Sequence, residues 1–494
     1  MELSKNNLKG LIEPIVYDGI KEGTYKVSEC DSTELLTWNR LDLGFKLFYL
    51  DNLKKNNSLA LEMYKSDIGC QTMGTYKELG NDEKNSFDVY VQEFKKTYNS
   101  IKENGFDKNK TILPVTDSMS IINGAHRLAS AIHLNKSISY VRLNTADMIC
   151  DYNNYYKKNI PSEHIENAVN TFLKYSNNCY IAFLWPSGKK NEKKSISKFS
   201  EVIYQKELTL TPTGAENLLI ELYKHMDWVG AEQNGYPGVK KKLIECFPIF
   251  QPFTVIAFQS SDLHKVREIK EAVREVNGIG FSSVHITDTK QEAIDISNLI
   301  FNSNGLHFLN YARPYKYVTE HTKLSLFKEF LIKNKLNFDE ALIDGGLSLS
   351  LYGLRKSNDI DFFVSDSSRI KVLSKDIDEH DSELKYHLVE KEELIFNPKY
   401  HFIYNGLKIV SFEQLYKMKI NRNDKKDNND CRVMNSLIIN NGFLKKINDL
   451  RQIFFYTRIK VIYFFISPIM QLLRNVGLYY KVREIYRKIK NNQL

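Results

Sequence analysis

The chain has 494 residues, of which 42% are hydrophobic and 12% aromatic. This length exceeds what one hydrophobic core normally serves, and the composition is that of folded proteins, so we expect about three domains and exclude a largely disordered chain. The formal net charge is +9, but nearly all of it belongs to residues 451–494. The rest of the chain is close to neutral, which argues against a nucleic acid as the partner.

The six cysteines are scattered along the chain, and no two of them form a Cys-x-x-Cys pair. This spacing argues against a zinc ribbon and against a disulfide scaffold, and it favours a reducing compartment. The N-terminal residues lack the apolar core of a signal peptide, and no uncharged apolar run reaches the length of a spanning helix, about 18 residues. We therefore expect a cytoplasmic protein.

The first informative segment is residues 121–134, in which a short apolar strand ends at Asn123 and Gly124. We expect a helix to begin at about Ala125, with His126 and Arg127 in its first turn and another strand at 137–143. Backbone N–H groups, the helix dipole and the guanidinium would then face one place, which suits a phosphate. The alternative is that the His-Arg pair caps the helix and faces water.

Residues 160–315 alternate apolar strands with helical stretches and predict an α/β layer domain of unknown role. Within it, Lys270 and Arg274 share a helix face, while His285 and Asp288 lie at the end of a strand, where such sheets often bind ligands. The alternative is that these four are solvated surface residues. The expected strands are 180–185, 253–258 and 283–287, the expected helices lie near 214–226, 262–277 and 290–301, and the lysine-rich segment 188–198 is expected to be a solvated loop.

A glycine pair and two aspartates dominate residues 341–364. Gly345 and Gly346 follow an apolar strand, a helical stretch comes next, and Asp359 and Asp361 lie in a second apolar run. Alternate residues of a strand project to the same side, so the two carboxylates can share a hard cation such as Mg²⁺. Glycines let backbone N–H groups approach a phosphate chain, and Arg355 adds a fixed positive charge. The alternative is an edge strand whose aspartates are solvated.

This arrangement resembles the nucleotidyltransferase superfamily, which includes aminoglycoside nucleotidyltransferases, tRNA nucleotidyltransferases and DNA polymerase beta. The resemblance covers about residues 322–445 and implies that Gly345 and Gly346 line the triphosphate and that Asp359 and Asp361 are catalytic metal ligands. A lysine-bearing helix followed by a charged run also matches later parts of many members, with Lys419 as a further nucleotide contact. The residues in this pattern are Lys417, Lys419, Arg422, Lys426, Asp427 and Asp430.

The sequence departs from the superfamily at one point. Active members usually carry a third carboxylate on a later strand, and the expected strand here, residues 400–405, offers His401 and no acid. Asp427 and Glu393 are the candidate substitutes. If neither serves, the domain binds a nucleotide without turning it over.

The segment around the first motif, about residues 35–145, resembles the ParB/sulfiredoxin fold. That family includes CTP-binding partition proteins, sulfiredoxin and a kinase of free serine, and its members carry a Gly-x-His-Arg-like phosphate box. The resemblance implies that Gly124, His126 and Arg127 contact a nucleotide phosphate. Asn123 stands where aspartate is common, and Glu78 is a candidate for the base of a kinase.

The C-terminal segment, residues 451–494, interleaves aromatic and aliphatic residues with cations. Its longest apolar stretch, 461–473, contains Pro468 and is too short to span a membrane. Such a segment suits a helix lying on an anionic membrane surface; the alternative is a helical hairpin packed on the preceding domain.

The expected architecture is therefore a multidomain α/β and α+β chain. Its parts are a ParB/sulfiredoxin-like domain at 1–150, an α/β domain at 160–315, a nucleotidyltransferase-like mixed-sheet domain at 322–450 and a basic helical tail at 451–494.

The expected function is Mg²⁺-dependent nucleotidyl or phosphoryl transfer from ATP or CTP to a small metabolite or glycan precursor. In its fullest form this is a kinase joined to a nucleotidyltransferase, acting in surface polysaccharide biosynthesis at the inner face of the membrane. Two alternatives stay open. One is a nucleotide-sensing protein with an inactive nucleotidyltransferase fold, and the other is a nucleotidyltransferase toxin.

Overall fold

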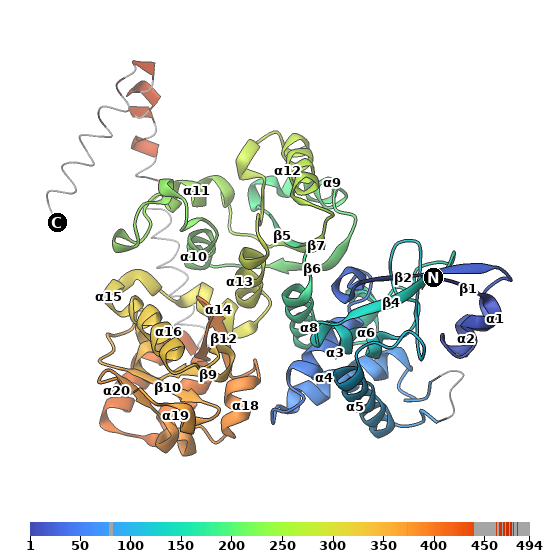
Figure 1. Cartoon of the computed structure of the whole chain (residues 1–494). Coiled ribbons are helices and arrows are strands. Elements are labelled where there is room, and N and C mark those ends of the chain that lie inside the picture. Colours follow the sequence, from blue (N-terminus) through green and yellow to red (C-terminus); the bar gives the residue numbers. More distant parts are fainter. Residues whose placement is uncertain are drawn as a thin grey trace.

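The computed structural model describes residues 1–78, 83–372 and 374–438, together with scattered positions between 461 and 482. Three sheets, each with its own helices, follow one another along the chain, and Figure 1 shows them in sequence colours. We name them the N-terminal module (1–157), the middle module (162–311) and the C-terminal module (318–438). The expected mixed α/β class is confirmed.

The N-terminal module has a four-stranded sheet in the order β1-β2-β4-β3, in which only β3 and β4 are parallel. The expected helix start at Ala125 and the expected strand after it are present as α6 and β4. The strands are β1 (Glu2–Ser4), β2 (Thr24–Asp31), β3 (Leu113–Val115) and β4 (Ser137–Arg142). The helices are α1 (Lys5–Leu8), α2 (Pro14–Gly19), α3 (Asp42–Asp51), α4 (Ser58–Gln71), α5 (Phe87–Asn104), α6 (Ala125–His133) and α7 (Tyr152–Lys157).

The middle module is an antiparallel sheet in the order β6-β7-β5-β8, with helices on both faces. Helices α8 and α13 cover one face and α9 and α12 the other, because both faces of β5 are apolar. The strands are β5 (Cys179–Leu184), β6 (Val202–Leu208), β7 (Phe253–Gln259) and β8 (Val284–Ile286). The helices are α8 (Ser162–Tyr175), α9 (Glu192–Ile196), α10 (Pro212–Tyr223), α11 (Val239–Cys246), α12 (Leu263–Asn277), α13 (Lys290–Ile300) and α14 (Ser303–Tyr311).

One expectation for this module is wrong. The lysine-rich segment 188–198 is a 3₁₀ turn followed by α9, not a loop. Asn191 donates to the carbonyl of Val276 at 2.9 Å and Ser195 is buried against α12. The backbone of the segment is thus fixed by α12 while most of its lysines remain in water.

The C-terminal module has a five-stranded mixed sheet in the order β11-β10-β9-β13-β12. The expected strand, helix and strand around the glycine pair are β9, α17 and β10. The strands are β9 (Ala341–Asp344), β10 (Ile360–Val364), β11 (Ile377–Glu379), β12 (His401–Tyr404) and β13 (Leu407–Val410). The helices are α15 (Val318–His321), α16 (Lys323–Lys333), α17 (Gly345–Leu351), α18 (Lys391–Phe396), α19 (Phe412–Arg422) and α20 (Lys425–Ile438).

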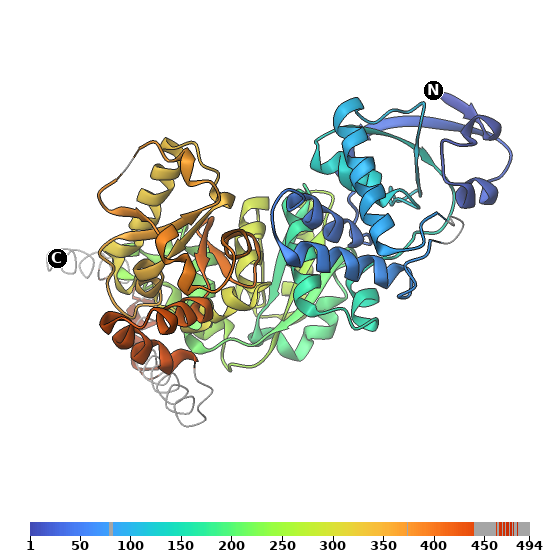
Figure 2. The ribbon, with the colours of Figure 1, turned by 90° about the horizontal axis from the view of Figure 1, so that it is seen from below.

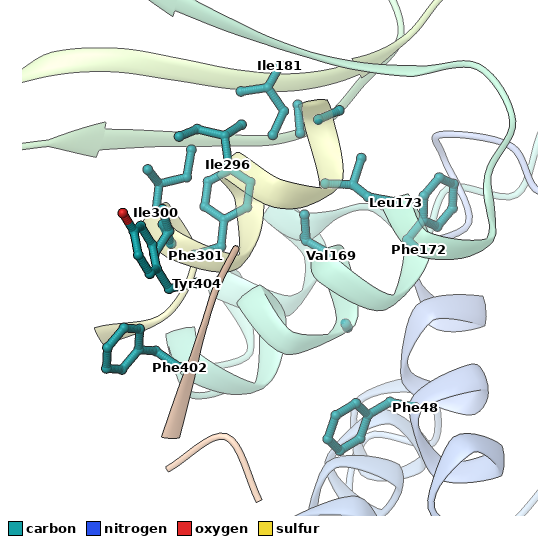
Figure 3. Close-up of a cluster of buried hydrophobic side chains, with 14 of the residues drawn as sticks. Phe48, Val169, Phe172, Leu173, Ile181, Ile296, Ile300, Phe301, Phe402 and Tyr404 are labelled. Carbon is teal, nitrogen blue, oxygen red and sulfur yellow. The ribbon is translucent and has the colours of Figure 1, made fainter. Parts of the chain in front are cut away.

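One hydrophobic core contains side chains of all three modules, and two smaller clusters among the described residues lie within the middle and the N-terminal module. Figure 2 shows the middle module between the other two, and Figure 3 shows side chains from each of them at their junction. Phe48 of α3, Phe172 of α8 and Phe402 of β12 belong to this core and are buried. Full burial of such a side chain contributes about 1.5–3 kcal/mol, so the shared core fixes the modules relative to one another.

The predicted membrane-facing tail at 451–494 lies mostly outside the described residues. Among the residues that are described, no helix is both long and apolar enough to cross a membrane.

Candidate functional site

The turn between β9 and α17 is built against the carboxylate of Asp361. Gly345 has a φ of +62°, which favours glycine, and a Cβ at this position would overlap the Asp361 side chain. The backbone N–H of Gly346 donates to Asp361 Oδ2 at 3.2 Å. The glycine pair and the second aspartate of the predicted motif are therefore in direct contact.

The two aspartates of the motif do not belong to an edge strand of the sheet. β10 lies between β11 and β9, so the alternative of an edge strand is wrong. The side chain of Asp361 is only 15% exposed, and burial, together with the charges of Asp359 and Asp344, raises its pKa against the opposing effect of His380. Within the described part of the chain, the carboxylate of Asp359 makes no hydrogen bond or ion pair.

Asp344 and His380 complete this acidic site, and sequence reasoning missed both. Asp344 lies directly opposite Asp361 in the antiparallel pairing of β9 with β10, and its side chain is fully buried. His380 follows β11 and bridges the two acids, with Nδ1 3.1 Å from Asp344 Oδ2 and Nε2 3.3 Å from Asp361 Oδ1. His387 Nε2 also lies 3.3 Å from Asp344 Oδ2, whereas Asp344 Oδ1 has no hydrogen-bond partner among the described residues.

The charges of this group reinforce one another. Burial by itself would raise the pKa of Asp344, but the charges and hydrogen bonds of His387 and His380 hold it well below its usual range. Burial by itself would lower the pKa of His380, but Asp344 and Asp361 raise it. The two directions agree, because the negative charge of Asp344 and the positive charge of His380 each favour the charged form of the other.

The expected positions of a third carboxylate are not at this site. His401 is on β12, at the far edge of the sheet from β10, where it is buried against the carbonyl of Leu394. The carboxylate of Glu393 accepts a hydrogen bond from the backbone of Ser58, in the N-terminal module. On its outer side β10 pairs with β11, on which Asp378 lies opposite Asp361 in register.

The predicted cations gather behind the glycine turn. The guanidinium of Arg355 lies against Gly346 and makes two hydrogen bonds to Asp430, of 2.6 and 3.0 Å. Lys419 is buried and its Nζ lies 2.8 Å from Asp430 and 3.1 Å from Asp427. Arg355 and Lys419 thus meet at one aspartate, which links the loop after α17 to α19 and α20.

Of three further residues in the predicted charged run, one belongs to this network and two lie at the surface. Arg422 binds Asp427, and hydrogen bonds and charges from Arg422 and Lys419 outweigh burial and lower the pKa of Asp427 to about 2. Lys417 pairs with Glu413 on the exposed side of α19, and Lys426 is exposed. Asp427 therefore neutralises buried cations and is not the missing acid.

The side chains at this site fit a magnesium ion that has few protein ligands. No group of three His, Cys, Asp or Glu side chains within the described residues is placed to hold a metal. Mg²⁺ is usually held by one or two carboxylates, with phosphate oxygens and water as the other ligands, and Asp359 and Asp361 match that requirement.

A cavity of about 480 Å³ lies at the β10–β11 edge and is lined by Asn358 and Ile360, on the side of the strand away from Asp361.

The N-terminal motif converges on a cavity of about 380 Å³, lined by Glu13, Glu78, Lys84, Gly124, His126 and Arg127. Gly124 is the N-cap of α6 and has a φ of +90°, and a Cβ there would overlap the side chain of Arg127. His126 Nε2 lies 2.9 Å from the hydroxyl of Tyr64. Burial and nearby cations hold the pKa of His126 well below its ordinary value, so the ring is neutral.

The cations of this cavity already have acidic partners. Arg127 binds Glu13 and Thr111, and burial lowers its pKa to about 10. Lys84 pairs with Glu78 at 2.7 Å. A phosphate entering the cavity must therefore compete with Glu13 for the guanidinium.

A buried cluster of four charges lies behind the same motif, and sequence reasoning missed it. Arg40 makes two hydrogen bonds to Asp42, of 2.8 Å each, and Lys46 bridges Asp42 and Asp67. Arg40 also donates to the carbonyl of Ile121. The cluster thus anchors the chain just before Asn123 and Gly124.

The four residues singled out in the middle module do not form one site. Lys270 pairs with Asp288 at 3.1 Å, and His285 lies 3.0 Å from Glu292. Arg274 pairs with a neighbour on its own helix and stacks on Phe281. Most of these contacts link neighbouring elements, as in a structural role.

No protein-family model, curated protein or solved structure matches the chain.

Proposed function

We propose that the chain binds a nucleoside triphosphate with Mg²⁺ in the C-terminal module and transfers the nucleotidyl group to a hydroxyl of a small metabolite or glycan precursor. One observation carries the proposal: the turn at Gly345 and Gly346 is shaped against Asp361, and the carboxylate of Asp359 beside it is free of protein partners within the described residues. A nucleotidyltransferase-like fold of residues 322–450 is part of the proposal.

Each residue has a role that follows from its position. Asp359 and Asp361 would hold Mg²⁺, which supplies positive charge to the phosphate oxygens. Arg355 is fixed by Asp430 beside Gly346, and there it would bind the triphosphate. Lys419 acts through Asp430 and positions Arg355. The acceptor hydroxyl attacks the α-phosphorus and its proton passes to water, the bond from the α-phosphorus to the oxygen it shares with the β-phosphate breaks, and pyrophosphate leaves.

The test is pyrophosphate release by the full chain with Mg²⁺, each of the four nucleoside triphosphates and a set of sugar and polyol acceptors. Asp359→Asn and Asp361→Asn should each abolish release. The matched control is Asp366→Asn, because Asp366 lies just beyond β10 and caps the next turn. Unchanged release by Asp359→Asn would overturn the proposal.

We also propose a second phosphate contact in the N-terminal cavity, made by Gly124, His126 and Arg127 of a ParB/sulfiredoxin-like module. Their convergence on one cavity supports it. Two such sites would suit phosphorylation of an alcohol followed by its activation as a nucleotide conjugate, with Glu78 as the candidate base. Thermal stabilisation by ATP or CTP should lose one component in Arg127→Met and the other in Asp359→Asn. Loss of both components in either variant would contradict two separate sites.

A second candidate function is nucleotide sensing without turnover. The imidazole of His380 on Asp361 favours it, since it occupies one oxygen of a carboxylate that catalysis needs. Calorimetry with product chromatography separates the two candidates. Binding of a triphosphate without any product would select the sensor.

A further inference from the structure

We infer that the acidic site of the C-terminal module takes one divalent cation, not two, because the imidazole of His380 stands where a second cation would bridge the carboxylates. The inference rests on the proposed function, since it concerns the cation of that same site.

The position of His380 follows from the sheet. β11 pairs in parallel with β10, and Asp378 lies opposite Asp361. His380 comes two residues later, so it projects to the same side as Asp361. Its two ring nitrogens reach one oxygen of Asp361 and one of Asp344, at 3.3 and 3.1 Å.

These contacts use the atoms that a second cation needs. Two-metal sites hold their ions about 3.5–4 Å apart and share bridging carboxylates. Here Asp361 Oδ1 faces His380, and Asp361 Oδ2 accepts from the backbone of Gly346. The carboxylate of Asp359 has no partner within the described residues, and each oxygen of Asp361 keeps a second lone pair, so the two acids can together hold one ion.

The imidazole is held firmly in this place. The side chain of His380 is 16% exposed and that of Asp344 is fully buried. His387 lies against the same oxygen of Asp344, and both rings pack edge-on to Phe363. A cation entering between Asp344 and Asp361 would have to displace a packed ring, whereas a cation at Asp359 would not.

The experiment is the number of Mn²⁺ ions bound by the full chain with no nucleotide, measured by electron paramagnetic resonance. Mn²⁺ serves as the probe because it takes the same oxygen ligands as Mg²⁺. The number at this site is the difference between the wild type and a double variant, Asp359→Asn with Asp361→Asn. We expect a difference of one ion.

Variants of His380 sharpen the test. His380→Asp supplies a carboxylate in place of the ring and should raise the number of ions bound at this site to two. His380→Gln should leave that number at one. His264→Asp is the matched control, because His264 is an exposed histidine on α12, and it should change nothing. Circular dichroism of each variant verifies the fold.

Three results would overturn the inference. They are a difference of two ions, or of none, in the wild type, and loss of the ion in a folded His380→Gln, which would make His380 a ligand. The proposed transfer is judged separately by pyrophosphate release. One bound ion without pyrophosphate release would refute the proposed transfer and support the inference. Two bound ions with pyrophosphate release would support the transfer and refute the inference.

Discussion

The carboxylate of Asp361 fills the space that a Cβ at Gly345 would need. Because β9 and β10 are adjacent antiparallel strands, the turn that leaves β9 comes back over the acid on β10. The glycine is thus required by a tertiary contact as well as by its own φ of +62°. This relationship makes the turn and the acidic pair one unit.

Gly345→Ala should destabilise the chain and prevent triphosphate binding. The left-handed φ alone costs about 1–2 kcal/mol for a residue with a Cβ, and displacing Asp361 adds about 1–3 kcal/mol. Gly278→Ala is the control, since Gly278 has a φ of +66° but open space around its Cβ position. The free energies of unfolding in urea should separate the two variants, and equal losses would show that the contact with Asp361 carries no energy.

Lys419→Met should be among the most damaging changes in the C-terminal module. Lys419 is buried between Asp427 and Asp430, and removing one partner of a buried charge network typically costs about 3–5 kcal/mol. Lys417→Met, on the same helix, removes only an exposed pair with Glu413 and should cost less than about 0.5 kcal/mol. Urea unfolding of both variants tests this. A loss in Lys419→Met as small as that in Lys417→Met would contradict a structural role for the network.

The contacts of His380 should make stability depend on pH in one direction. Its pKa in the folded chain is raised above the ordinary value of 6.5, so its contribution is fully present below pH 6.5 and is lost as the pH rises through the folded pKa. The stability difference between wild type and His380→Gln should therefore be largest in mild acid and shrink above neutral pH. Unfolding curves from pH 5 to 9 measure it, and a difference that grows with pH would refute the raised pKa of His380.

Glu13→Gln should strengthen anion binding in the N-terminal cavity. Glu13 neutralises Arg127, and its removal frees a guanidinium beside the N-cap glycine of α6. We expect the affinity for inorganic triphosphate to rise about tenfold, which corresponds to about 1.4 kcal/mol. Glu22→Gln is the control, because Glu22 is 80% exposed and pairs with Lys5. Calorimetry of the wild type and the two variants measures these affinities. Weaker binding by Glu13→Gln would contradict the prediction and would show that Glu13 itself contacts the ligand.

The sequence by itself determined the local pieces of the candidate site. Apolar runs broken by glycine predicted β9, α17 and β10, and the Asn-Gly step predicted the start of α6, because periodicity and turn chemistry act over neighbouring residues. The family resemblance grouped six charged residues, and the structure joins four of them in one network: Lys419, Arg422, Asp427 and Asp430.

Only the tertiary structure decided which side chains meet. β11 lies beside β10 after an intervening loop, and parallel pairing between such strands is not encoded in either strand alone. Asp344 and His380 were therefore missed, while His401, the residue at the expected third position, lies at the far edge of the sheet. The acids Asp427 and Glu393 have partners away from the acidic site for the same reason. The partner of a charged side chain depends on which residues folding brings near it, and the spacing of residues in the sequence does not predict this.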